Sequence, residues 1–132
     1  GSIYVDPLPD FGGFKLGYND LVQTAGTWTK TTMPNSNTPI ISCTDTTCDG
    51  EFTFTGTKFY LTGVRGNNVG EFEIFIDDGP AISIQERQSA EIAQNNSPVV
   101  LYQSDELEFK PHKVKIHRTL YDVLLVNLLY SN

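Results

Sequence analysis

Residues 71–80 read EFEIFIDDGP, and this stretch decides the fold. Phe72, Ile74 and Ile76 occupy every second position, so an extended strand presents all three side chains on one face. The segment DDGP at 77–80 contains the Asp-Gly pair that is typical of a tight hairpin turn. We therefore predict a strand that ends in a tight turn, followed by a second strand in which Ile82 and Ile84 share a face.

The same alternation extends along the chain in both directions. Residues 121–130 are apolar at both alternating sets of positions, which is typical of a central strand covered on both faces. Only residues 88–96 could hold a helical turn, and that segment is short and polar. The sequence therefore predicts an all-β protein, an antiparallel β-sandwich of jelly-roll or Greek-key topology with about eight or nine strands. The other strands are expected in residues 51–55, 59–62, 81–87, 99–102 and 112–118.

Length and composition bound the class of protein. The chain has 132 residues, of which 39% are hydrophobic and 19% charged, and these values suit one globular domain. The longest apolar-rich run, residues 121–130, is far shorter than a transmembrane helix, so we expect no membrane insertion. The opening Gly1-Ser2 looks like a cloning scar, and we expect residues 3–132 to form a single domain.

The charge of the chain argues against nucleic-acid partners. It has 9 basic and 16 acidic residues, a formal net charge of −7, which repels phosphate backbones and anionic lipids. The basic residues from Lys110 to Arg118 are interpreted as the outer face of a strand that pairs with acidic neighbours such as Glu71 and Glu73. A small anion-binding patch is the alternative.

The two cysteines, Cys43 and Cys48, are separated by four polar residues, which is a spacing that can close a tight disulfide loop. Two free thiols are one alternative. A metal site is another, but two cysteines alone cannot complete a zinc shell. We expect the disulfide, and a disulfide implies an oxidising compartment.

Residues suited to catalysis are few. His112 and His117 are five apart on a predicted strand, so they point to opposite faces and cannot share a metal. We expect His112 to be packed and hydrogen-bonded, and His117 to be solvated. The Asp77–Asp78 pair is interpreted as turn chemistry. The sequence contains no nucleophile elbow or phosphate-binding loop, and we expect a protein that is not an enzyme.

Several segments together resemble the galactose-binding-like jelly-roll domains. That family shares a Phe-x-Gly-Thr strand start, a strand that closes in Asp-Gly, a late apolar pair, and a His-x-Val-x-Val type strand. Here Pro111 stands where the family usually has Gly before the histidine. The matching segments are residues 54–63, 68–79, 101–102, 111–116 and 124–126.

The resemblance implies binding rather than catalysis. Members of the family commonly act as carbohydrate-binding modules or cell-surface adhesion domains, with ligands in the loops at one end of the sandwich. Many carry a structural calcium ion in those loops, although no cofactor or metal ligand is derived from this sequence. We therefore expect a lectin-like, non-catalytic carbohydrate-binding module of a larger secreted or cell-surface protein. The alternative is a structural or protein-interaction sandwich that binds a surface protein and has no sugar site.

The candidate ligand site combines an aromatic platform with directional polar groups. Arg65, Asn67 and Asn68 form a glycine-bounded loop that offers donors to sugar hydroxyls. Trp28 and Tyr102 are the candidate aromatic rings. We expect the core between the sheets to contain Phe59, Leu61, Phe72, Ile74, Ile76, Val114, Ile116 and Leu125.

Overall fold

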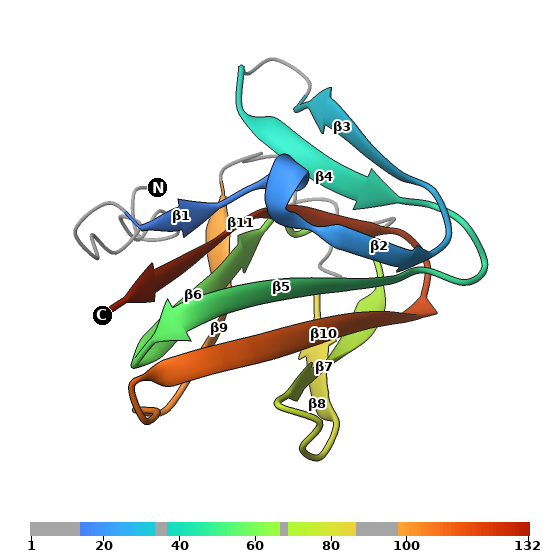
Figure 1. The fold of residues 1–132 in the computed structure, drawn as a ribbon. Coiled ribbons are helices and arrows are strands. Elements are labelled where there is room, and N and C mark those ends of the chain that lie inside the picture. The colour runs from blue at the N-terminus through green and yellow to red at the C-terminus, as the bar shows by residue number, and fades with distance from the viewer. Residues whose placement is uncertain (1–13, 34–36, 67–68, 87–97) are drawn as a thin grey trace.

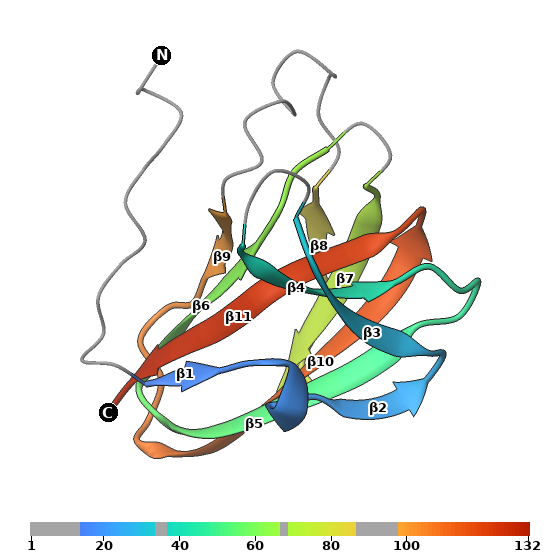
Figure 2. The same ribbon diagram turned by 90° about the horizontal axis from the view of Figure 1, so that it is seen from above.

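The computed structural model describes residues 14–33, 37–66, 69–86 and 98–132, which form two antiparallel sheets lying face to face (Figures 1 and 2). One sheet has the order β3-β4-β11-β6-β9, with β1 added alongside β11, and the other has the order β2-β5-β10-β7-β8. The strands are β1 Lys15–Leu16, β2 Val22–Ala25, β3 Trp28–Thr32, β4 Pro39–Cys43, β5 Asp49–Gly56, β6 Lys58–Gly63, β7 Glu71–Ile76, β8 Ile82–Gln85, β9 Val99–Gln103, β10 Lys110–Leu120 and β11 Val123–Ser131, and Tyr18–Asp20 form a 3₁₀ turn.

The predicted fold class, a jelly-roll β-sandwich, is confirmed. The described residues form eleven strands rather than about eight or nine. The additional strands include β1 and β2, which are two and four residues long and lie in the N-terminal part of the chain, where apolar alternation is weak. The short, polar segment 88–96, the one place where the sequence allowed a helical turn, lies outside the described residues. No described helix has the length and apolarity needed to cross a lipid bilayer.

The core between the sheets is built from the alternating positions. Seven of the eight predicted core side chains are buried, and Ile76 is partly buried and packs against the others. Burying one such side chain stabilises the folded state by about 1.5–3 kcal/mol. The further buried members include Trp28, Phe52, Phe54, Val123 and Leu128.

Strand β11 is central and covered on both faces, as predicted. Its inward side chain Leu125 belongs to the main core. Its outward side chains Leu124 and Val126 pack against a small second cluster of Met33, Ile40 and Val64. This second cluster explains why residues 121–130 lack a polar face.

The Cys43–Cys48 disulfide is present and links the end of β4, in one sheet, to the residue before β5, in the other. Arg118 Nη1 donates to the Thr46 carbonyl at 2.8 Å, which ties the disulfide loop to β10. Gly26 has φ +78°, and a Cβ atom there would lie 2.3 Å from the Thr47 carbonyl oxygen. Glycine at 26 therefore allows the β2–β3 turn to approach this loop closely.

The two histidines differ from each other in their environments. His112 is buried and hydrogen-bonded through both ring nitrogens, as predicted. The prediction for His117 was incomplete, because the half-exposed ring forms a 2.5 Å contact between Nδ1 and Asp49 Oδ1. This pair could not be predicted from local sequence, because residues 49 and 117 belong to strands that are far apart along the chain.

Candidate functional site

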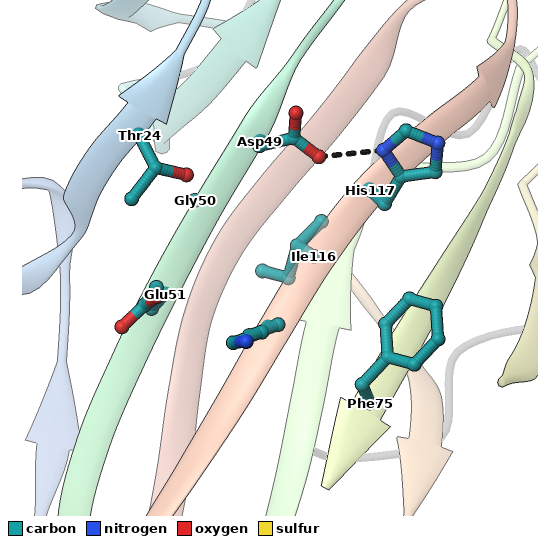
Figure 3. A pocket seen from close by; sticks show the side chains of 8 residues that line it. Thr24, Asp49, Gly50, Glu51, Phe75, Ile116 and His117 are labelled. Atoms are coloured by element: carbon teal, nitrogen blue, oxygen red, sulfur yellow. Dashed lines mark hydrogen bonds and ion pairs between the residues drawn. The ribbon is translucent and has the colours of Figure 1, made fainter. Parts of the chain in front are cut away.

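A groove crosses the outer face of the five-stranded sheet, over β2, β5, β10 and β7 (Figure 3). Its volume is about 600 Å³, within the range of small-molecule sites in proteins. Its lining residues are Thr24, Asp49, Gly50, Glu51, Phe75, Lys115, Ile116 and His117.

Strand alternation and register together place these side chains. Val114 and Ile116 face the core, so Lys115 and His117 face outward from β10. Phe75 faces outward from β7 for the same reason, because Phe72 and Ile74 are buried.

Cross-strand pairing then brings outward residues from three strands into rows. Lys115 lies opposite Glu51 of β5 and opposite Phe75 of β7. In the next row His117 lies opposite Asp49 and Glu73. An aromatic ring, an ammonium group, an imidazole and carboxylates therefore share one face of the sheet.

The Asp49–His117 pair orders one end of the groove. Nδ1 of His117 lies 2.5 Å from Oδ1 of Asp49, as Figure 3 marks. The Asp49 backbone is held from the core side, because its carbonyl accepts a 3.0 Å hydrogen bond from Trp28 Nε1. The groove and the sole tryptophan of the chain are thus linked through one residue.

Lys115 is held by Asp78 of the β7–β8 turn, at 2.8 Å between Nζ and Oδ1. The hydrogen bond with Lys115 lowers the pKa of Asp78, and the same contact raises the pKa of Lys115. Both side chains are well exposed, and exposed ion pairs contribute little to stability. Lys115 can therefore exchange this partner for a ligand at small cost.

These groups suit the recognition of a polyhydroxylated ligand. An aromatic face such as that of Phe75 packs against the apolar face of a sugar ring. Carboxylates accept hydrogen bonds from hydroxyls, whereas the Lys115 ammonium group donates them. Within the described ranges, no three His, Cys, Asp or Glu side chains converge on a possible metal position.

Of the sequence-predicted ligand residues, Trp28, Tyr102 and Arg65 lie in the described part of the chain, and these three do not share one site. Trp28 is only 2% exposed and belongs to the main core. A ring buried in this way has no face to offer a sugar, so Trp28 is not carried into the proposed site. The indole instead supports Asp49 from behind.

Tyr102 lies on β9 and packs inward, with its ring centroid 5.8 Å from that of Phe59. Burial and the nearby Asp105 carboxylate raise the pKa of Tyr102. Phe59 is near the start of β6, whereas Arg65 follows the end of that strand. Tyr102 and Arg65 therefore do not form one site.

Arg65 lies at the end of the sandwich where β6 leaves the sheet, and its Nη1 donates to the Gln85 carbonyl. Asn67 and Asn68 lie outside the described residues. Arg65 is therefore the one residue of the predicted loop site that the structure describes. The role of this loop in ligand binding stays a prediction.

Glu86 lies beside Arg65 and was not singled out from the sequence. It is 0% exposed, and its Oε1 accepts a 3.1 Å hydrogen bond from the Leu124 amide. Oε2 has no hydrogen-bond partner within the described ranges. Burial raises the pKa of Glu86 well above its usual value, and this effect outweighs the lowering by the Leu124 amide and Arg65.

Sequence reasoning also missed most of the groove. The outward direction of Lys115 and His117 was predicted, but Thr24, Asp49, Glu51 and Phe75 were not grouped with them. The available signal was that each occupies an outward position of an alternating strand.

No family model matches the sequence, and no curated protein matches it either. Solved structures do match its fold. A family 6 carbohydrate-binding module is 13% identical, with a TM-score of 0.61 over 89% of this chain and 92% of that one. A CBM36 module in complex with calcium and xylotriose is 9% identical, with a TM-score of 0.52 over 86% and 95% of the two chains.

Enzymes also contain this fold. An exo-beta-1,3-galactanase from Phanerochaete chrysosporium is 11% identical, with a TM-score of 0.64 over 89% of this chain but only 29% of the enzyme. The chain spans about a third or less of the enzymes that match it first. These similarities establish that the chain shares the jelly-roll β-sandwich fold of these carbohydrate-binding modules.

Proposed function

We propose that the chain is a non-catalytic carbohydrate-binding module of a larger secreted or cell-surface protein. One observation carries the proposal: the Phe75 ring shares a groove of about 600 Å³ with Lys115, Glu51 and the Asp49–His117 pair. The fold shared with carbohydrate-binding modules supports the same function. The Cys43–Cys48 disulfide is compatible with an oxidising compartment outside the cytosol.

The ligand of the groove is a glycan segment that lies across β10. Its apolar face packs on Phe75, and its hydroxyls donate to Glu51 and accept from Lys115. The groove is open, so a small ligand stays partly solvated and binds with a dissociation constant of about 0.1–1 mM. The loop of Arg65, Asn67 and Asn68 is a second proposed contact for the same class of ligand.

The test is a glycan array with the wild-type chain, followed by calorimetry on the best oligosaccharide. Phe75→Ala should weaken binding by about tenfold, equivalent to 1.4 kcal/mol, without a change in melting temperature. Phe109→Ala is the matched control, because Phe109 is 63% exposed and does not line the groove. Absence of binding on a broad array would favour the protein-interaction alternative, and equal binding by Phe75→Ala would exclude the groove.

A further inference from the structure

A notch interrupts one edge of β11 in the six-stranded sheet. Strand β4 pairs with β11 over Val123–Leu125, and β1 pairs with it at Leu128 and Leu129. Because β6 occupies the other edge of β11 at these positions, β1 and β4 share one edge and leave a gap between them. A cavity of about 200 Å³ opens at this gap, beside Val126 and Asn127.

The notch is lined by two lysines, Lys15 from β1 and Lys30 from β3. Both lysines line one small cavity, so an anion bound there would have two cationic side chains beside it. Attraction to two positive charges would favour an anion in this cavity.

These lysines are also exceptional among the basic residues of the chain. Of the nine, Arg87 lies outside the described residues, and six of the other eight have a described partner. Only Lys15 and Lys30 have no described ion pair, hydrogen bond or ring contact. The six partnered residues are Lys110 with Glu108, Lys113 and Lys115 with Asp78, Lys58 over the Tyr60 ring, and Arg65 and Arg118 with backbone carbonyls.

The remaining lining suits the body of a small ligand. The Tyr18 ring is held in place, because its hydroxyl donates to the Trp28 carbonyl at 3.1 Å and accepts from Gln23 at 3.3 Å. The Asn127 amide oxygen accepts a 2.6 Å hydrogen bond from Thr62, which leaves the amide NH₂ group as its donor. Ile40 adds apolar surface.

We infer that this notch binds a small ligand that carries a carboxylate or sulfate group, such as one acidic sugar residue. The anionic group lies between Lys15 and Lys30, and the ring of the ligand packs against Tyr18. The cavity is smaller than the usual 300–1,000 Å³ of drug-sized sites, so it takes a single residue rather than a long segment. The site lies on the sheet opposite the groove and does not depend on the function proposed for the groove.

A different role is known for lysines on edge strands, which is to prevent pairing with another chain. β3 is an edge strand, so Lys30 could serve this role without any ligand. Ligand binding requires a response to small anions and depends on Lys15 as well as Lys30. Protection of the edge strand by Lys30 requires neither.

The experiment is a titration of the isotope-labelled chain, followed through its amide NMR signals at constant ionic strength. The probes are D-glucuronate, D-glucose 6-sulfate and neutral D-glucose. We expect both anionic probes, but not glucose, to shift the signals of Lys15, Tyr18 and Asn127. A response to glucuronate alone would identify the ligand group as a carboxylate, and a response to the sulfate alone would identify it as a sulfate ester.

Lys15→Ala/Lys30→Ala should weaken binding of the anionic probe at least tenfold, whereas the control Lys58→Ala/Lys113→Ala should bind as the wild type does. Phe75→Ala should also leave this binding unchanged, which separates the notch from the groove. The inference is overturned if neither anion shifts these signals, if glucose shifts them equally, or if the Lys15/Lys30 variant binds equally well. Self-association of the Lys15/Lys30 variant, together with no response of the wild type to anions, would also overturn the inference. That result would support the edge-protecting role of Lys30 instead.

Discussion

His112 Nδ1 lies 2.6 Å from Asp77 Oδ2, and this contact joins β10 to the turn between β7 and β8. The second ring nitrogen, Nε2, lies 2.7 Å from the Glu108 carbonyl oxygen. Both ring nitrogens of the buried His112 therefore have a hydrogen-bond partner. The other oxygen of the Asp77 carboxylate, Oδ1, accepts a 2.8 Å hydrogen bond from the Lys113 amide.

Asp77→Asn should remove the pH dependence that the Asp77 carboxylate contributes to the free energy of unfolding. Although burial opposes ionisation, the hydrogen bonds from His112 and Lys113 prevail and lower the pKa of Asp77 below its usual 3.8. The contribution of the carboxylate to stability is therefore fully present above pH 3.8 and is lost as pH falls through the lower, folded-state pKa.

Urea unfolding from pH 2 to pH 7 measures this dependence. The wild type should be the more stable protein at pH 7, and the difference between the two should shrink toward pH 2. Asp78→Asn is the matched control. The ion pairs that Asp78 forms with described residues are exposed, so this substitution should change stability little. Parallel pH curves for wild type and Asp77→Asn would refute the assignment.

Glu86→Gln should make the chain more stable than wild type at alkaline pH. Burial raises the pKa of Glu86 well above its usual 4.5, so the folded state retains a proton that the unfolded state releases. The free energy of unfolding of the wild type therefore falls as pH rises from 4.5 toward the folded-state pKa.

Denaturant titrations between pH 4.5 and pH 8.5 provide the measurement, and the slope with pH should be smaller for Glu86→Gln. The control is Glu108→Gln, because the Glu108 side chain is 83% exposed and should keep the wild-type slope. An unchanged slope in Glu86→Gln would show that Glu86 is ionised in the folded state.

Replacing both Cys43 and Cys48 by Ser should lower the free energy of unfolding by about 2 kcal/mol, because the closed loop is small. Alkylation followed by intact-mass measurement checks the bond itself. The untreated, denatured chain should take up no label, and the reduced chain should take up two. Equal labelling with and without reductant would show that the cysteines are free thiols.

Phe72→Ala should cost about 3–5 kcal/mol, because the Phe72 ring is fully buried between the sheets. Thermal unfolding followed by circular dichroism measures the loss. Phe109→Ala is the exposed counterpart and should melt close to the wild type. A wild-type melting temperature for Phe72→Ala would mean that the inward face of β7 has been misassigned.

Replacing Arg65 and Asn68 together by Ala should abolish glycan binding if the loop that contains them provides the hydroxyl contacts. Melting should change little, because the described hydrogen bond of Arg65, to the Gln85 carbonyl, is exposed to solvent. Calorimetry with the best array ligand distinguishes the loop from the groove. If this double variant binds normally and Phe75→Ala does not, the ligand lies in the groove alone.

The sequence by itself determined the inward and outward faces of the long strands. Side chains alternate with a period of two, so Phe72 and Ile74 had to share the inward face of β7. For the same reason Lys115 and His117 had to share the outward face of β10. The Asp-Gly turn and the short spacing of Cys43 and Cys48 are equally local signals. The period of two along the strands was therefore enough to predict the sandwich and its core. The short sequence spacing of the two cysteines was enough to predict the disulfide.

Only the tertiary structure decided which outward residues become neighbours. The register of β10 against β5 and β7 brings Glu51 and Phe75 to Lys115, and Asp49 to His117. These paired residues are 40 to 68 positions apart along the chain. Burial of Trp28 and Glu86 likewise depends on the elements that cover them, not on their own sequence neighbours. Long-range pairing is set by the packing of the whole sandwich, and a local pattern carries no information about it.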